Sequence, residues 1–487
     1  MDLTCGEAVS VIAVVGICLF WLKHQTVSLP PSLMRPFPLI GHLLHVNTDF
    51  RVDIPKWRMK CGDIFSVQLG AQLFVVLNGY DVIKEALVKK ADDFSERPRM
   101  HKDEIMISQG RGVQINSGPV WKEKRAVVIT ILKKFGMGKK LLASRVQDEV
   151  KYYLDHLHGF DGHPVDIRRI TTLSTANIIC HILTGQRYAY HDETLCKLVD
   201  EMDKFTNSNQ QAAVTIFFPF LKYLRRDTAL RRSVLEIQRR IQSFIESSKG
   251  KDPEDNFISS YQAEREGKLR RGEATTMNDL NLLKTVFDLF LGGTETTSTT
   301  ITWFALFMLN YPDVQEKIFE EINKCVGTER PPTLEDRPKL VYLNATIKET
   351  LRRASILPQS VARLCPNEVI LRGYTIPKGT IIVPNLDSVL FDDTIWGPDP
   401  WSFRPERFID EKGEIKNPEE LIPFGIGRRA CPGESLAQTE LFLYLSSLIQ
   451  RYHLLPVMPG FPPSLNYKCG LTMTPEYFQI KLMERKK

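Results

Sequence analysis

A single cysteine lies in the glycine-rich segment PFGIGRRACPGE, which runs from Pro423 to Glu434. The next residues carry apolar side chains at helical spacing, so Cys431 comes directly before a predicted helix (Leu436, Leu441, Leu445, Leu448 and Ile449). Backbone N–H groups and the positive end of a helix dipole stabilise a thiolate, which is the form that binds metals. An isolated loop cysteine is more often a small buried side chain, so the assignment of Cys431 as a metal ligand needs further signals.

The second signal is a long apolar segment, Leu280 to Tyr311, which predicts one helix across the whole domain. Its middle, LGGTETTSTTIT, is a poor helix sequence, because each glycine costs about 1 kcal/mol relative to alanine and threonine hydroxyls compete for backbone carbonyls. We expect the helix to bend or open near Gly292 and Gly293 and to hold water beside Glu295 and Thr296. Close packing against a neighbouring helix through small residues explains the same sequence equally well.

A third signal combines ETLR, Glu349 to Arg352, with the aromatic-rich loop FRPERF, Phe403 to Phe408. Glutamate and arginine three residues apart share one face of a helix and can form an ion pair. Exposed pairs of this kind are common and contribute little. Together with the second arginine, however, the pattern predicts one buried network of Glu349, Arg352 and Arg407.

Composition and charge exclude several other classes of protein. The 487 residues carry a net charge of +6, which is a mild excess that does not indicate a nucleic-acid-binding protein. The nine cysteines are scattered, without a CxxC pair or a CxxCH run. This argues against a disulfide framework, a zinc ribbon or covalently attached c-type haem, and it favours a reducing compartment.

The N-terminal segment differs from the rest of the chain. Ala8 to Leu22 is free of charged residues and is followed by Lys23 and His24, which predicts a membrane anchor over residues 1–25 with the remaining chain in the cytosol. A cleaved signal peptide is the alternative, although its positive charges would come first. Residues 26–41 contain several prolines and predict a stiff hinge.

Residues 42–487 predict one mainly α domain with small β-sheets. Strand patterns occur at 65–78 and 369–384, and the charged stretch 249–278 is expected to be an exposed loop. No repeat or long linker divides this part of the chain.

These signals together resemble one family, the cytochrome P-450 haem-thiolate monooxygenases. The resemblance covers essentially the whole chain, and within the family it is strongest to the animal microsomal family 2 members. The matching motifs are FGIGRRACPG (424–433), GGTETT (292–297), ETLR (349–352), PERF (405–408) and WKEKR (121–125). The cysteine motif is highly specific, whereas the others are weak alone.

The resemblance implies that haem b (heme b) is the cofactor, with Cys431 as the axial thiolate ligand of its iron. The residues implied for binding the haem propionates are Arg97, Trp121, Arg125, Arg363 and Arg429. Arg363 stands where relatives often have histidine, and its guanidinium suits a carboxylate at least as well. Thr296 and Glu295 are implied as the catalytic pair that orders water and delivers protons to bound O2.

The implied substrate is lipophilic: a fatty acid, a steroid or a xenobiotic. The implied pocket residues are Gln114, Ile115, Asp288, Leu291, Gly292, Leu357, Val361 and Leu471. A hydrogen bond within the protein is the more favoured role of Asp288, ahead of a salt bridge to a basic ligand. Two departures from the family pattern are Gly292, where alanine is common, and RASILPQ after ETLR, where many relatives have a His-Pro pair. IFFPFLKYLRR, residues 216–226, is expected at a membrane-touching entrance or a buried helix end.

The implied partners are O2, the membrane of the endoplasmic reticulum and a separate NADPH-cytochrome reductase, with cytochrome b5 as a further donor. No dinucleotide-binding motif occurs in the chain itself. A basic face for an acidic reductase is expected from Lys122, Lys124, Lys133, Lys134, Lys139, Lys140 and Arg428, which are otherwise ordinary solvated charges. Two other functions stay open: a haem-thiolate isomerase that rearranges a peroxide or epoxide, and a haem carrier or gas sensor without turnover.

Overall fold

The computed structural model describes residues 28–47, 49–98, 112–135, 140–207 and 228–485. The predicted anchor and the predicted entrance at 216–226 lie outside these ranges. Within them, no helix is both long and apolar enough to cross a membrane. The chain divides into two compact units, a smaller one of residues 1–98 and 361–385 and a larger one of residues 99–360 and 386–487.

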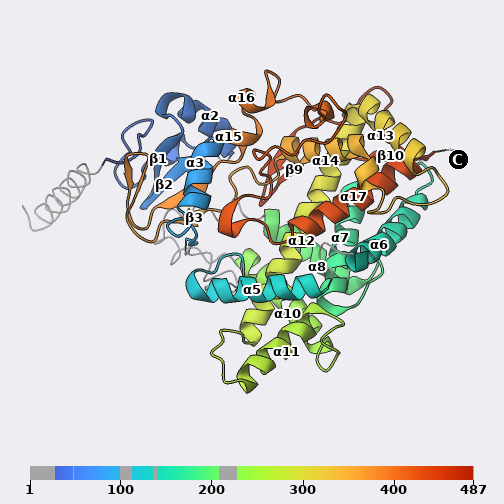
Figure 1. Ribbon diagram of the computed structural model, residues 1–487, viewed down its shortest axis with the longest axis horizontal. Helices are drawn as coiled ribbons and strands as arrows, with labels where there is room; N and C mark the ends of the chain where they lie inside the picture. Colours follow the sequence, from blue (N-terminus) through green and yellow to red (C-terminus); the bar gives the residue numbers. More distant parts are fainter. Residues whose placement is uncertain (1–27, 48, 99–111, 136–139, 208–227, 486–487) are drawn as a thin grey trace, which may run out of the picture. The chain divides into compact units, whose positions relative to one another are not determined.

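The smaller unit is built on a four-stranded sheet (Figure 1). Its order is β1 (Ile64–Leu69), β2 (Gln72–Leu77), β6 (Ile381–Pro384) and β3 (Arg363–Leu364). β2 pairs antiparallel with β1 and parallel with β6, in registers such as Phe65 opposite Val76. A hairpin of β4 (Val369–Leu371) and β5 (Tyr374–Ile376) confirms the strand patterns at 369–384. The helical elements of this unit are η2 (Leu43–His45), α2 (Phe50–Cys61), α3 (Tyr80–Lys84) and the π-turn η3 (Glu85–Lys89).

The described part of the proline-rich segment, residues 28–41, contains no helix. This segment lies along the sheet of the smaller unit. The carbonyl oxygens of Pro30 and Pro31 accept hydrogen bonds from the hydroxyl and the N–H of Ser66, each at 2.8 Å. Gly41 bridges to Leu69, with φ +64° and no room for a Cβ atom against the Gln68 carbonyl. The hinge is therefore part of the smaller unit.

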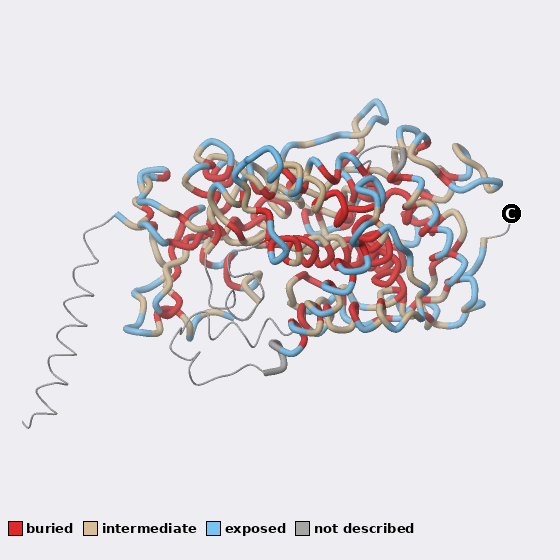
Figure 2. The backbone as a smooth tube through the Cα atoms, turned by 90° about the horizontal axis from the view of Figure 1, so that it is seen from below, coloured by how far each residue is buried: buried red, intermediate tan, exposed pale blue. Residues whose placement is uncertain are grey.

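The larger unit is mainly helical, and its buried residues (red in Figure 2) gather inside it. Its longer helices are α5 (Gly118–Lys134), α6 (Lys140–His158), α7 (Ile167–Thr184), α8 (Glu193–Asn207), α10 (Thr228–Ser247), α11 (Phe257–Arg270), α12 (Asp279–Asn310), α13 (Pro312–Cys325), α14 (Val341–Ala354) and α17 (Glu434–Arg451). Short helical turns are η5 (Arg337–Lys339), α15 (Asp387–Leu390), α16 (Asp393–Trp396), η6 (Pro405–Phe408) and η7 (Gly427–Arg429). Its described residues also form two small antiparallel strand pairs: β7 (Tyr452–Pro456) with β10 (Ile480–Glu484), and β8 (Tyr467–Cys469) with β9 (Met473–Pro475).

Helix α12 matches the predicted long helix to within one residue at each end. It begins where the side chain of Asn278 accepts a hydrogen bond from the Asn281 N–H at 2.8 Å. The helix is continuous through Gly292 and Gly293, so the predicted opening does not appear as a break. α12 packs along α7 (Figure 1), and a Cβ atom on Gly293 would lie 2.3 Å from Ile179. Gly293 is thus explained by close helix packing, the alternative that the sequence left open.

One prediction about the larger unit is wrong. The stretch 249–278, expected as an exposed loop, contains the helix α11. Asn256 caps it by accepting a hydrogen bond from the Ser259 N–H at 2.9 Å. Phe257, Ile258 and Tyr261 are buried. The sequence did not predict this helix, because these few apolar residues lie within a stretch that is mostly charged.

Candidate functional site

The loop before α17 holds Cys431 in a defined backbone conformation. The Cys431 N–H donates to the Phe424 carbonyl at 2.9 Å, and the Ala430 N–H donates to the Gly427 carbonyl at 3.0 Å. Gly425 and Gly427 have φ angles of +69° and +77°, which side chains with a Cβ atom rarely adopt. The glycines therefore set the turn that presents the cysteine at the start of α17.

Cys431 is an exposed residue, and its sulfur faces backbone N–H donors. Densely packed protein atoms around it raise the pKa of the thiol, while the N–H groups of Gly433 and Glu434 and the charge of Arg125 act in the opposite direction. A metal ion that binds here must displace the thiol proton, and the donors then stabilise the negative sulfur. The chemistry of this site fits a thiolate ligand.

Two arginines and a tryptophan connect helix α5 to the cysteine loop. The Arg125 Nη2 donates to the Ala430 carbonyl at 2.7 Å. The guanidinium of Arg429 lies 3.6 Å from the centroid of the Trp121 ring, and its Nη2 donates to the Asn116 carbonyl at 2.6 Å. Helix α5 thus places Trp121 and Arg125 beside the residues that precede Cys431.

This cluster has polar atoms that suit the propionates of a haem. The Nε1 of Trp121 is buried and has no hydrogen-bond partner among the described residues. Arg125 forms no ion pair with the carboxylate of any described residue. Burial lowers the pKa of its guanidinium. A buried donor without an acceptor is rare, and a carboxylate ligand would satisfy it. The residues present therefore fit the expected cofactor.

The other two arginines expected at the propionates, Arg97 and Arg363, belong to the smaller unit. Their Nη1 atoms both donate to the Val361 carbonyl, at 2.6 Å from Arg97 and 3.0 Å from Arg363. Arg363 is 2% exposed, and burial lowers its pKa to about 10. Its Nε has no partner among the residues described. The structure thus places these two arginines together, with unused donor capacity on Arg363.

Adjacent residues of α12 face different surroundings. The hydroxyl of Thr296 donates to the Gly292 carbonyl at 2.6 Å, so both residues lie on one face of the helix. Gly292 is exposed, and a Cβ atom there would meet nothing within 4 Å. This face of α12 is therefore open in the middle of a largely buried helix.

Glu295 instead lies in a buried polar cluster. Its Oε1 accepts a hydrogen bond from the Thr472 hydroxyl at 3.0 Å and lies 3.6 Å from the Nη2 of Arg168. Burial raises the pKa of Glu295, and the charge of Arg168 only partly offsets this. Nothing in the sequence pairs Glu295 with Arg168 or Thr472, because both come from distant segments. No hydrogen bond joins the side chains of Glu295 and Thr296, which are both described.

The Asp288 carboxylate holds a loop against α12. Its Oδ2 accepts hydrogen bonds from the N–H groups of Val113 and Gln114, at 2.7 and 2.9 Å. Gly112, with φ +89°, leaves room for this oxygen. Burial raises the pKa of Asp288 to about 6. The carboxylate thus has the internal role that the sequence favoured over a salt bridge to a ligand.

The remaining pocket candidates lie in loops and on α12. Ile115 follows Gln114 in the loop before α5, and Leu291 is buried on α12. Leu357 and Leu471 lie in loops of the larger unit, whereas Val361 belongs to the smaller one. The loop with the unusual RASILPQ sequence begins at Ser355, which has φ +35°. Its Ile356 carbonyl accepts a hydrogen bond from the Met473 N–H at 2.9 Å, which connects this loop to β9.

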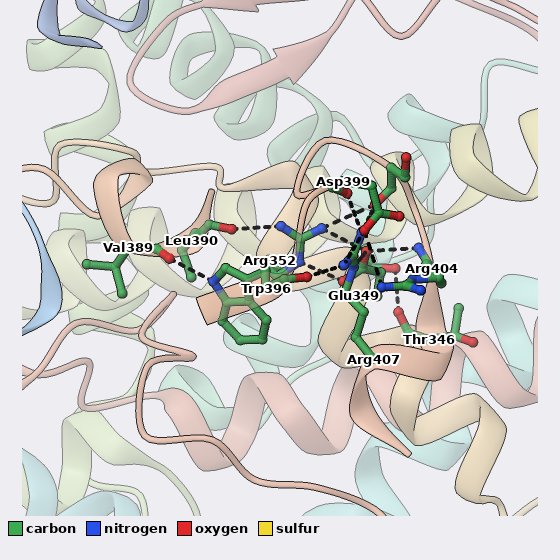
Figure 3. Close-up of polar contacts among 11 residues, drawn as sticks. Thr346, Glu349, Arg352, Val389, Leu390, Trp396, Asp399, Arg404 and Arg407 are labelled. Carbon is green, nitrogen blue, oxygen red and sulfur yellow. Dashed lines mark hydrogen bonds and ion pairs between the residues drawn. The ribbon is translucent and has the colours of Figure 1, made fainter. Parts of the chain in front are cut away.

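The structure brings Glu349, Arg352 and Arg407 into one buried cluster (Figure 3). Arg352 donates from Nε and Nη2 to both oxygens of Glu349, at 2.7 and 2.8 Å. The Nε of Arg407 lies 3.5 Å from Glu349, and its Nη1 lies 2.9 Å from Asp399. The Arg404 N–H also donates to Glu349 at 2.9 Å. The cluster joins α14 to the loop that contains η6.

The expected basic face is only partly present. Lys122, Lys133, Lys134 and Arg428 are exposed. Lys124 is not part of it, since it is 1% exposed and donates to the Asn281 side chain on α12. The prediction that Lys124 belongs to the basic face is wrong because this residue lies on the side of α5 that faces α12. The side chains of Lys139 and Lys140 lie outside the described part of the structure.

Comparison with known proteins gives one consistent result. The chain matches the family model described as Cytochrome P450 over residues 30–482. It is 34% identical to cytochrome P450 2U1 of Homo sapiens, over 96% of this chain and 84% of that protein. It is 32% identical to cytochrome P450 2E1 of Oryctolagus cuniculus, over 99% of each, and 34% identical to cytochrome P450 2G1 of Rattus norvegicus, over 94% of each.

Proposed function

The chain belongs to the cytochrome P450 family, and on this premise we propose that it inserts one oxygen atom of O2 into a lipophilic substrate. Family members are haem-thiolate monooxygenases and bind haem b through a cysteine. The observation that carries the assignment is the position of the exposed Cys431, which the glycine turn places between α17 and the Trp121–Arg125 cluster.

The cofactor has identifiable partners in this chain. When bound, haem b supplies the iron that binds and activates O2, and a thiolate ligand favours cleavage of the O–O bond. Cys431 provides the thiolate. Trp121 would bind the propionates through its buried Nε1, and Arg125 through a guanidinium that has no described carboxylate as an ion-pair partner. Arg97, Arg363 and Arg429 complete the proposed set.

Proton delivery is assigned to Thr296, with Glu295 as a supporting residue. The Thr296 hydroxyl lies on the open face of α12 beside Gly292, where it can hold a water molecule by hydrogen bonding. Glu295 is turned toward Arg168 and Thr472, so a proton from its carboxyl reaches the open face only through water or a side-chain rotation. We therefore place Thr296 closer to the chemistry than Glu295.

The electrons are proposed to come from NADPH through a separate reductase, with cytochrome b5 as an additional donor. The exposed Lys122, Lys133, Lys134 and Arg428 provide positive charge for an acidic partner, and Arg428 lies in the cysteine loop itself. The location proposed is the endoplasmic reticulum membrane, through an anchor in residues 1–25, with the catalytic domain in the cytosol.

A lipophilic substrate, whether fatty acid, steroid or xenobiotic, is supported by the apolar character of most proposed pocket residues, such as Ile115, Leu291 and Leu357. The internal hydrogen bonds of Asp288 remove the clearest acidic contact for a basic ligand.

The first experiment is the absorption spectrum of the reduced protein with carbon monoxide, for wild type and Cys431→Ala. A strongly red-shifted Soret band in wild type that is absent from the variant would support Cys431 as the thiolate ligand. A spectrum typical of histidine-ligated haem in fresh protein would overturn it. Product formation that depends on NADPH and reductase then separates a monooxygenase from an isomerase or a carrier.

Thr296→Ala tests the proton-delivery assignment. We expect haem content to stay at the wild-type level, because the hydrogen bond of the Thr296 hydroxyl to a described residue stays within α12, while NADPH consumption is diverted from product to hydrogen peroxide. The measurement is the ratio of product to NADPH consumed, with Thr300→Ala as the control, since Thr300 is buried and bonds the carbonyl one turn back. An unchanged ratio in Thr296→Ala would show that another group delivers the proton.

A further inference from the structure

A pocket of about 340 Å³ lies between α6 and α7, which run side by side in the larger unit (Figure 1). None of its lining residues belongs to the cysteine loop, to α12 or to the proposed substrate pocket. One wall is apolar, from Leu142, Ile178 and Ile182. The volume is within the range of small-molecule sites, which begins at about 300 Å³. The pocket is therefore large enough for a ligand with both a polar and an apolar part.

The polar side of the pocket carries cations with unused donors. The Nη1 of Arg145 is buried and has no hydrogen-bond partner among the described residues. Lys151 also lines the pocket and forms no ion pair with any described residue. A buried guanidinium N–H without an acceptor is costly, and an anion would satisfy it.

Arg187 is held rigidly at the edge of this group. Its guanidinium lies 3.7 Å from the centroid of the Tyr152 ring and 5.3 Å from that of Tyr190. The Nε donates to Glu149 at 2.7 Å, while the terminal nitrogens make no hydrogen bond to any described residue. A guanidinium fixed in this way is preorganised to donate two parallel hydrogen bonds.

The acidic groups of the pocket do not cancel these cations. Glu149 is already engaged, since it accepts hydrogen bonds from Tyr190 at 2.6 Å, from Ser174 at 3.1 Å and from Arg187. Asp148 is exposed and forms no ion pair with any described residue. Arg145, Lys151 and Arg187 against Asp148 and Glu149 leave one net positive charge. The remaining ionisable group, His181, has its pKa lowered by burial and by Arg145.

We propose that the pocket between α6 and α7 binds a small organic anion, with its carboxylate or phosphate group on Arg145 and Arg187 and its apolar part against Leu142, Ile178 and Ile182. This site is separate from the haem and from the oxidised substrate. Because the pocket is much larger than a single phosphate ion, the apolar wall contributes to binding and selects organic anions over inorganic ones.

The test uses phenyl phosphate as the probe, with phenol as its neutral analogue and inorganic phosphate as the anion alone. Binding to the full-length, haem-loaded protein in detergent is measured by calorimetry, and the Soret band is recorded in parallel. The variants are Arg145→Gln and Lys151→Gln, with Arg239→Gln as the control, because Arg239 is exposed on α10 and does not line the pocket.

We expect phenyl phosphate to bind without a Soret shift, inorganic phosphate to bind more weakly and phenol not to bind. Arg145→Gln should weaken phenyl phosphate at least tenfold, Lys151→Gln should weaken it less, and Arg239→Gln should have no effect. Equal affinity in wild type and Arg145→Gln, or a Soret shift that follows binding, would overturn the proposal. If Arg145→Gln does not fold, unchanged affinity in Lys151→Gln together with binding of phenol overturns it.

Discussion

Arg352 and Arg125 are both arginines on helices of the larger unit, but their partners differ. Arg352 is fully buried and donates two hydrogen bonds to Glu349, with further bonds to the Leu390 and Ser402 carbonyls. Arg125 donates to the Ala430 carbonyl and forms no ion pair with a described carboxylate. The first charge is neutralised within the chain, whereas the second is left for a ligand. The internal carboxylate gives Arg352 a structural role, and its absence at Arg125 is consistent with the proposed role of Arg125 in binding the cofactor.

The same contrast occurs between neighbours on α12. Gly293 and Glu295 face protein, against Ile179 and against Arg168 with Thr472. Gly292 and Thr296 face open space. A single helix thus has a packed side that contacts the rest of the protein and an open side where we propose that the chemistry takes place. Partners within the chain distinguish the two kinds of residue better than residue type does.

The largest test of this comparison is Glu349→Gln. It leaves Arg352 buried without a counter-charge and leaves Arg407 with Asp399 alone, and breaking a buried pair costs about 3–5 kcal/mol. We expect a loss of this size in the free energy of unfolding, measured by urea titration in detergent. Glu320→Gln on α13, an exposed residue, is the control and should change stability by less than about 0.5 kcal/mol. Similar values for the two variants would contradict a structural role of the cluster.

The sequence predicts this buried cluster and the cysteine turn because their residues are close together in the chain or belong to compact motifs. The pattern of apolar residues also predicts the long helix, the helix after Cys431 and the strands. The surroundings of Glu295 could not be predicted, since Arg168 and Thr472 reach it only through the packing of α7 and the β8–β9 turn against α12. The prediction that Lys124 lies on the surface is wrong for the same reason. Its partner Asn281 is distant in the sequence and reaches it only through packing of the helices.

Asp288 is intermediate between residues with a charged partner inside the protein and residues without one. Its carboxylate accepts hydrogen bonds from N–H groups but has no ion pair with a described cation. Its pKa of about 6 is above the ordinary value of 3.8, so between these values the folded state binds more protons than the unfolded state. We therefore expect stability to fall as pH rises from about 3.8 to about 6, by on the order of 3 kcal/mol.

Asp288→Asn keeps an oxygen acceptor and removes this titration. We expect the variant to be as stable as wild type or less stable near pH 4, and more stable at pH 8, in urea unfolding at both values. Asp313→Asn on α13, an exposed carboxyl, is the control. If the free energy of unfolding depends on pH in the same way for wild type and Asp288→Asn, the Asp288 carboxyl does not cause the loss of stability at higher pH.

Arg125→Gln tests the other class of arginine. Because no internal carboxylate loses its partner, the free energy of unfolding without haem should change by less than about 1 kcal/mol. Loss of a charge-assisted hydrogen bond should raise the rate of haem dissociation by about tenfold or more. The measurement is transfer of haem to apomyoglobin, with Lys122→Gln on the exposed side of α5 as the control. A large loss of protein stability with unchanged haem retention would show that Arg125, like Arg352, has a structural role.

The smallest effects are expected at the two glycines of α12, where the comparison predicts opposite signs. Gly292→Ala adds a methyl group into open space and gains helix propensity, so it should stabilise the apoprotein by up to about 1 kcal/mol. Gly293→Ala makes the same gain, but its Cβ would lie 2.3 Å from Ile179 Cδ1 and 2.8 Å from Cγ1. Overpacking of this kind costs about 1–3 kcal/mol, so the net effect should be destabilising. Urea unfolding of both variants measures the difference, and equal signs would mean that the two faces of α12 are packed alike.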